Sequence, residues 1–182
     1  MSIKKIWRFL WKDNSLLSWI INLILAFVIV KFLVYPGLGL LFNTPFPVVA
    51  VVSSSMEHNS NFDGWWENNK DYYFAKQITK DQFETFDFHH GFNKGDIMVL
   101  QGVKEYNIGD ILVYSTTYYN YPIIHRIIEK DPIITKGDNN NIADPKEVSE
   151  TQIQGKAIVK IPLLGWIKIW FNDVLKIFTG GI

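Results

Sequence analysis

One apolar stretch near the N-terminus restricts most strongly what this chain can fold into. Residues 15–35 carry a single charge, Lys31. About 20 apolar residues suffice for a helix that crosses the hydrocarbon core of a bilayer. A cleaved signal peptide has a shorter apolar region that leads to small residues, whereas here Tyr35-Pro36-Gly37 follows. The pattern therefore predicts an uncleaved transmembrane anchor.

Basic residues precede this anchor. The N-terminal segment, residues 1–14, holds four basic residues against one acidic residue, Asp13. Positively charged flanks stay on the cytoplasmic side of a membrane. We therefore expect a single-pass protein of the cell membrane, with residues 1–14 in the cytoplasm and everything after the anchor on the outer or lumenal side.

The composition excludes several classes of function. With 18 basic and 18 acidic residues the formal net charge is zero, so no nucleic-acid partner is expected. The absence of cysteine excludes disulfides, thiol catalysis and cysteine-based zinc sites. The adjacent His89 and His90 point in different directions and have no carboxylate at ligand spacing. We therefore expect neither a metal nor a cofactor.

Segments of different composition follow the anchor. Residues 36–47 hold three prolines and two glycines, which predicts a short linker. Residues 48–162 predict a β-rich domain. Within it, residues 58–93 are rich in Asn, Asp and aromatic residues and predict a surface insertion with one short helix near residues 80–86. In residues 163–182 apolar side chains recur with helical period, which predicts an amphipathic tail that lies on the membrane or packs on the domain.

Short apolar runs separated by turn residues make up the rest of the domain. The predicted strands are 48–52, 95–100, 109–114, 121–128, 132–135 and 157–161. The second and third of these runs each begin with a Gly-Asp turn. Short strands at this spacing are typical of a mainly β, barrel-like domain.

Three serines follow the first predicted strand directly. The run Val48–Val52 leads into Ser53, Ser54 and Ser55. A strand that ends in hydroxyls can hold one of them rigidly beside a backbone N–H, as nucleophilic catalysis requires. Serine clusters after strands are also common as ordinary turns. A catalytic interpretation therefore needs a base and an orienting group elsewhere in the chain.

Candidates for both partners lie downstream. His125 is the only histidine in a predicted strand, and Asp138 and Asp144 lie in a polar turn after another strand. Each has a structural interpretation as well, since a strand histidine can be a core residue and turn aspartates bond their own backbone. The chain order Ser, His, Asp is no objection, because catalytic triads occur in several orders.

These motifs together resemble the type I signal peptidases, in particular the archaeal and endoplasmic-reticulum branch. The motifs are Ser-x-Ser-Met-Glu, Gly-Asp-Ile, Ile-His-Arg, Lys-Gly-Asp-Asn-Asn and Gly-Trp-Ile, within residues 16–57 and 94–166. The resemblance implies a β-fold with its active site at the outer membrane surface. It implies a membrane-bound serine endopeptidase that removes signal peptides from secreted preproteins after small residues. The implied partners are preproteins, the lipid bilayer and the secretion translocon.

The resemblance also assigns roles to residues. Ser55 matches the nucleophile, His125 matches the histidine that stands where bacterial enzymes carry lysine, and Asp144 matches the third triad member. Asp138 matches a second important carboxylate with a structural or orienting role. The Ser55 N–H and the Ser53 hydroxyl are the candidates for the oxyanion hole.

Two departures from the family pattern and two alternatives stand beside this assignment. Ser54 replaces the glycine that the family has between its serines, and residues 58–93 replace a few residues. The first alternative is a Ser-Lys peptidase of the same fold with Lys136 as base, although a lysine in a polar turn lacks the desolvation that would lower its pKa. The second is a catalytically inactive membrane-anchored β-domain that binds nascent exported chains. The complete Ser, His and Asp set favours an enzyme.

Overall fold

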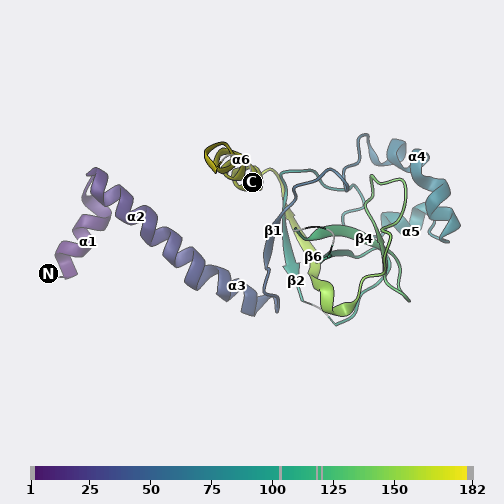
Figure 1. Cartoon of the computed structure of the whole chain (residues 1–182), viewed down its shortest axis with the longest axis horizontal. Helices are drawn as coiled ribbons and strands as arrows, with labels where there is room; N and C mark the ends of the chain where they lie inside the picture. Colours follow the sequence, from purple (N-terminus) through teal and green to yellow (C-terminus); the bar gives the residue numbers. More distant parts are fainter. Residues whose placement is uncertain (1–2, 103, 118, 120, 180–182) are drawn as a thin grey trace. The chain divides into compact units, whose positions relative to one another are not determined.

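A computed structural model describes residues 3–102, 104–117, 119 and 121–179 of the chain. The chain divides into two compact units, Met1–Leu41 and Phe42–Ile182. The first is helical, and the second is built around a β-sheet (Figure 1).

The first unit consists of a short helix and a long apolar helix. Its elements are α1 (Ile3–Lys12), α2 (Leu16–Ile29), the π-helical turn η1 (Val30–Val34) and α3 (Tyr35–Leu41). Ser15 caps α2, because its hydroxyl accepts the Ser18 N–H at 3.2 Å. Of the described residues, 16–41 form the one helix that is long and apolar enough to cross a membrane, with a mean hydropathy of 2.5. The predicted apolar anchor, residues 15–35, lies within it except for the capping Ser15.

The long helix extends further than the sequence predicts. The sequence suggests an end at Tyr35 and a linker over 36–47, whereas the helix continues to Leu41. Proline lacks an N–H, and its ring clashes with the carbonyl one turn earlier in a regular helix. The π-helical turn directly before Pro36 accommodates this, because the Tyr35 N–H bonds the Val30 carbonyl five residues back.

Over the residues that the structure describes, the second unit contains one six-stranded sheet. Its strands are β1 (Val48–Ala50), β2 (Ile97–Gln101), β3 (Ile111–Tyr114), β4 (Ile123–Glu129), β5 (Ile134–Lys136) and β6 (Ile153–Ile161). Their order across the sheet is β1-β2-β6-β3-β4-β5, and all neighbours are antiparallel. The predicted mainly β domain after one N-terminal helix is confirmed.

Both Gly-Asp turns lead into strands as the sequence predicts. The Asp96 carboxylate accepts the Asn93 N–H at 2.9 Å before β2, and a matching bond of 2.9 Å precedes β3 at Asp110. Gly95 has a φ of +92°, and a Cβ at this position would collide with the Trp166 indole. Only glycine fits there.

The main core lies behind the segment that carries the serines. Val51, Met56 and Phe92 pack with buried side chains of β2, β3, β4 and β6. Met56 directly follows Ser55 and is 0% exposed. Full burial of a side chain of this size stabilises a fold by about 1.5–3 kcal/mol. Met56 therefore anchors the turn that contains Ser55.

The inserted segment, residues 58–93, forms two helices with an aromatic core of their own. These are α4 (Phe62–Ala75) and α5 (Lys80–Glu84), and both are labelled in Figure 1. The short helix predicted near residues 80–86 is present as α5. No helix was predicted over α4, because aromatic and polar residues alternate there without a helical stripe. The rings of both helices pack against Ile128 of β4.

The tail, residues 163–182, contains the helix α6 (Trp166–Thr179), which follows β6. A 3-10 turn, η2 (Glu150–Gln152), precedes β6. Ile169 is buried, whereas the described side chains of the predicted apolar face are exposed: Leu163, Ile167, Trp170, Phe171 and Val174. The structure therefore does not pack that face on the domain, which was one of the two predicted placements. Residues 180–182 lie outside the described residues.

Candidate active site

Ser55 lies in a turn that backbone hydrogen bonds hold on both sides. Before it, the Val51 N–H donates to the Asp96 carbonyl at 2.8 Å. After it, the Met56 carbonyl accepts the Phe92 N–H at 3.1 Å. Because both flanks are fixed, the main freedom left to the half-buried Ser55 hydroxyl is rotation among its side-chain rotamers.

His125 and Asp144 form a short, buried hydrogen-bonded pair. His125 lies on β4 and is 6% exposed, and its Nδ1 is 2.6 Å from Asp144 Oδ2. The same oxygen accepts the Tyr114 hydroxyl at 2.9 Å and the Thr135 hydroxyl at 2.7 Å. Burial raises the pKa of Asp144, but the hydrogen bonds and charge of its partners, His125 first, outweigh burial and hold the pKa below its ordinary value. The carboxylate is therefore ionised and fixes a proton on Nδ1.

Ser55, His125 and Asp144 line one cavity of about 220 Å³. Ser53 and Asn140 add polar groups to it. The remaining lining is apolar or aromatic: Ala50, Val52, Tyr119, Tyr121, Pro122, Ile123 and Ile124. The Ser55 hydroxyl is 3.2 Å from the Ser53 hydroxyl, and among the described residues no hydrogen bond joins it to His125. The three predicted residues thus share a cavity, with the serine side chain bonded to its neighbour.

Asp138 lies outside this cavity in a separate charged network. It is 0% exposed, and Arg126 donates to its two oxygens at 2.9 and 2.7 Å. His58 Nε2 is 3.1 Å from Oδ2 of the same carboxylate. Burial raises the pKa of Asp138, but the charge and hydrogen bonds of Arg126, with a smaller contribution from His58, lower it to about 2. Asp138 therefore carries a permanent negative charge at neutral pH.

The turn that contains Asp138 also supports the serine turn. The Asn139 N–H donates to the Ser55 carbonyl at 2.8 Å, and the Asn139 side chain donates to the Ser54 carbonyl at 3.1 Å. A Cβ on Gly137 would lie 2.7 Å from the Ser55 carbonyl oxygen, so glycine allows the two turns to approach. The Gly-Asp-Asn motif therefore holds the backbone of Ser54 and Ser55 in place.

Lys136 is buried, whereas the sequence predicts a polar turn around it. It is the last residue of β5 and is 1% exposed, where a solvated turn was expected. Its ammonium lies 5.1 Å from the ring centroids of Tyr72 and Tyr73, and burial lowers its pKa to about 8. Its Nζ donates to the Gly137 carbonyl at 3.1 Å. Lys136 is desolvated, but it is not among the residues that line the cavity of Ser55.

Four partners in these networks were not singled out from the sequence: Tyr114, Arg126, Thr135 and His58. The alternation of side chains along a strand does indicate that Arg126 points to the face opposite its neighbour His125. No sequence pattern indicates that His58, at the start of the inserted segment, reaches a carboxylate 80 residues later.

No family model matches the chain. Its sequence is similar to fungal proteins described as signal peptidase complex catalytic subunits. The sec11 subunit of Schizosaccharomyces pombe is 32% identical over 184 residues, which cover 91% of this chain and 89% of the relative. The SEC11 subunit of Scheffersomyces stipitis is 28% identical over 82% of this chain and 80% of its own length. The SEC11 subunit of Colletotrichum graminicola is 25% identical over 78% and 73% of the two chains.

Proposed function

Because the chain belongs to the type I signal peptidases of the endoplasmic-reticulum and archaeal type, we propose that Ser55, His125 and Asp144 are its catalytic triad. The enzyme is a hydrolase that removes signal peptides from preproteins. The observation that carries the triad is the shared cavity, which is lined by the serine and by an imidazole whose Nδ1 is held by a carboxylate.

The geometry supports His125 as the general base. Asp144 holds the imidazole with its Nδ1 proton inward, so Nε2 is the nitrogen left to accept the proton of Ser55. The serine hydroxyl leaves Ser53 by rotation about its Cα–Cβ bond when a substrate occupies the cavity, since catalytic hydrogen bonds often tighten only in the complex. His125 then returns the proton to the leaving amine, and Asp144 stabilises the imidazolium between these steps.

The oxyanion of the tetrahedral intermediate has two candidate donors. The backbone N–H of Ser55 makes no hydrogen bond with another described residue, and the Ser53 hydroxyl lies 3.2 Å from the nucleophile. Removal of one such donor costs about 3–4 kcal/mol of transition-state stabilisation. Ser53→Ala should therefore lower kcat by roughly 100- to 1,000-fold, with a small change in KM.

The size of the cavity supports a preference for small residues before the cleaved bond. At about 220 Å³ it is shared by the catalytic groups and by the substrate side chain. Apolar walls from Ala50, Val52 and Ile124 leave a shallow subsite, which rejects large side chains by steric clash. The edge strand β1 leads into this cavity, so an extended peptide has backbone groups to pair with beside it.

The apolar helix and the basic segment before it support a membrane arrangement. We infer that residues 1–14 remain cytoplasmic and that the sheet domain lies on the outer or lumenal side, where preproteins leave the translocon. The exposed apolar side chains of α6 give the domain a second contact with the bilayer. Protease added to intact spheroplasts should digest the domain and spare the first residues. Protection of the domain would contradict this orientation.

Purified full-length enzyme in phospholipid vesicles, assayed on a preprotein, tests the triad. The native chain should cleave after a small residue, and Ser55→Ala and His125→Ala should be inactive with unchanged circular dichroism. Asn141→Ala, a substitution on the exposed loop beside the cavity, is the matched control and should retain activity. Cleavage by Ser55→Ala would reject the nucleophile. Binding without cleavage by the native chain would favour the inactive binding domain.

The same assay separates a histidine base from a lysine base. His125→Lys should be inactive, because an ammonium beside the Asp144 carboxylate stays protonated and cannot accept the serine proton. Lys136→Met should remain active, because Lys136 lies outside the cavity lining. An active His125→Lys together with an inactive Lys136→Met would establish a Ser-Lys peptidase.

A further inference from the structure

His58, the first residue of the inserted segment, contacts the loop that holds the backbone of Ser55. The His58 side chain is 2% exposed and stacks on Trp65, with ring centroids 3.8 Å apart and an interplanar angle of 4°. Its Nε2 is 3.1 Å from the Asp138 carboxylate, and the Trp65 indole N–H donates to the Asp138 backbone carbonyl at 3.2 Å. Two stacked rings of the insertion therefore hold one aspartate by its side chain and by its main chain.

The hydrogen-bonding role of the His58 Nε2 follows from its partner. Asp138 is ionised, so the Nε2 that faces it must carry the proton. Nδ1 is buried and has no hydrogen-bond partner among the residues that the structure describes. Arg126 supplies the positive charge that balances the carboxylate.

The contact continues from Asp138 to Ser55. The next residue, Asn139, donates its N–H to the Ser55 carbonyl at 2.8 Å, and the Asp138 N–H lies 3.3 Å from the Met56 sulfur. A shift of Asp138 therefore moves the chain at Ser55 and at Met56, the residue that follows it. A displacement of about 1 Å at a reacting group can cost roughly 100-fold in rate.

We propose that His58 is a positioning residue for Ser55, and that the inserted segment stabilises the turn that contains Ser55. The proposal rests on Ser55 as the nucleophile. His58 touches neither the cavity nor the reacting atoms, and it acts through Asp138 and Asn139. The hydrogen bond from Nε2 is the required feature, while the stacked ring provides the burial.

Two substitutions separate the hydrogen bond from the packing. His58→Phe keeps a stacking ring and removes the donor, and it should lower kcat about 10- to 100-fold with little change in KM. His58→Gln keeps a donor and should recover most of the loss. His89→Phe, a change at another histidine of the same segment, is the matched control and should leave kcat unchanged. Native kcat in His58→Phe, or equal losses in His58→Phe and His58→Gln, would overturn the proposal.

Hydrogen exchange provides a readout that does not depend on catalysis. In His58→Phe the amide of Asn139 should exchange faster, because its acceptor at Ser55 is no longer held, while amides of β6 should be unchanged. Activity in Ser55→Ala would reject the nucleophile and leave this exchange result standing. An unchanged exchange rate at Asn139 would reject the positioning role alone.

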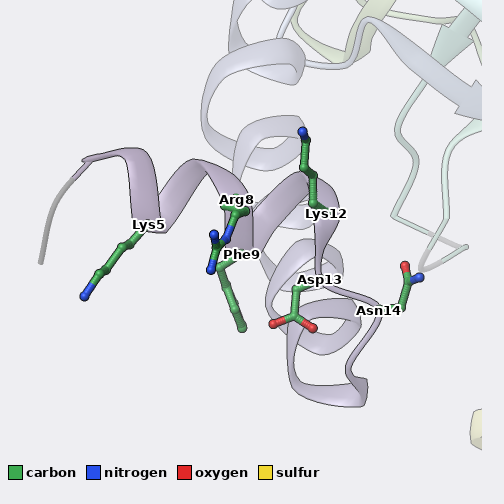
Figure 2. A pocket seen from close by; sticks show the side chains of 6 residues that line it. All are labelled: Lys5, Arg8, Phe9, Lys12, Asp13 and Asn14. Carbon is green, nitrogen blue, oxygen red and sulfur yellow. The ribbon is translucent and has the colours of Figure 1, made fainter.

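A second, independent observation concerns α1 in the helical unit. Lys5, Arg8 and Lys12 recur at intervals of three and four residues along α1. They line an open cavity of about 560 Å³, together with Phe9, Asp13 and Asn14 (Figure 2). All three basic side chains are exposed. Asp13, the acidic group there, accepts the Ser15 N–H at 2.8 Å.

This helix is fixed beside the start of the apolar helix. Ser18 and Asn22 of α2 donate to the Phe9 and Leu10 carbonyls at 2.8 and 2.9 Å, which are among the last carbonyls of α1 and lack helical partners. Trp7 and Trp11 are 62% and 71% exposed, with ring centroids 5.5 Å apart. Tryptophan rings of this kind favour the boundary between headgroups and acyl chains.

The geometry points to α1 as an interfacial helix that binds the phosphate groups of anionic phospholipids through Lys5, Arg8 and Lys12. The full-length protein is reconstituted in vesicles that contain brominated phosphatidylcholine or brominated phosphatidylglycerol. Comparison with Trp7→Phe/Trp11→Phe isolates the fluorescence of these two rings. Phosphatidylglycerol should quench it more strongly, and Lys5→Gln/Arg8→Gln/Lys12→Gln should abolish the difference.

A matched control and a competition complete the test. Lys104→Gln/Lys130→Gln, on the sheet domain, should retain the preference for phosphatidylglycerol. Added inorganic phosphate should not remove it, which separates a lipid headgroup from a free anion as the ligand. Equal quenching by the two lipids, or a preference that survives the triple substitution, would reject the lipid site.

Discussion

Asp138 and Asp144 lie in the same loop after β5, yet the protein surrounds them differently. Asp138 is fully buried and faces a permanent cation, Arg126, together with His58. Asp144 is half-buried and faces His125 and two hydroxyl groups. A carboxylate neutralised by a guanidinium is a fixed part of the fold. A carboxylate whose partner is an imidazole can stabilise a positive charge that exists only during the reaction.

The largest expected effect comes from Asp144. Asp144→Asn keeps the side-chain shape and removes the charge that fixes the imidazole, so kcat should fall by roughly 10⁴-fold. The thermal unfolding midpoint should change little, because no permanent cation is left unpaired. Preprotein cleavage and circular dichroism measure the two quantities. Near-native cleavage would mean that Asp144 has no part in the triad.

Asp138 should show the opposite pattern, with a large loss of stability. Asp138→Asn leaves the buried Arg126 guanidinium without its counter-ion, which costs about 3–5 kcal/mol of unfolding free energy. The midpoint of thermal unfolding in detergent should fall clearly, and activity should fall with it. Asp71→Asn, at an exposed carboxylate of α4, is the control and should unfold like the native chain. An inactive Asp138→Asn with a native midpoint would exchange the roles of the two aspartates.

Acid should remove the stabilisation that the ionised Asp138 carboxylate contributes, and it should do so in a defined pH window. The pKa of Asp138 is about 2 in the folded chain, against 3.8 ordinarily. The unfolded chain therefore binds this proton first as the pH falls, and the stabilisation is complete above about pH 4 and lost towards pH 2. The difference in unfolding midpoint between the native chain and Asp138→Asn should narrow across that window. A constant difference would show that the charge of Asp138 does not stabilise the fold.

The smallest expected effect concerns Lys136, whose pKa both carboxylates influence. Burial lowers this pKa to about 8, so between pH 8 and about 10 the unfolded chain binds more protons than the folded chain. Stability contributed by this group should rise with pH there, by at most about 1.4 kcal/mol per unit. The free energy of unfolding of Lys136→Met, measured with denaturant, should not rise with pH in this range. The same slope in both proteins would show that Lys136 stays protonated.

The local parts of this architecture follow from the sequence, and the long-range pairings do not. The strands and both Gly-Asp turns are encoded by neighbouring residues, so alternation and turn chemistry predict them. The pairs Arg126–Asp138 and His58–Asp138 join distant segments, and the residue pattern within a segment does not predict them. The burial of Lys136 depends on two tyrosines of α4, a helix without a regular apolar stripe. Pro36 suggested a helix end, because the π-helical turn that accommodates it has no sequence signature.

The continuous helix from Leu16 to Leu41 makes bilayer thickness relevant to this enzyme. Its 26 residues extend over about 39 Å, while a typical hydrocarbon core is about 30 Å thick. A rigid rod of this length matches a thin core only by tilting, and a thicker, sterol-rich core lets it stand more upright. In a bilayer, the thickness of the hydrocarbon core is therefore one factor in the inclination of this helix, separate from any contact at the cavity of Ser55.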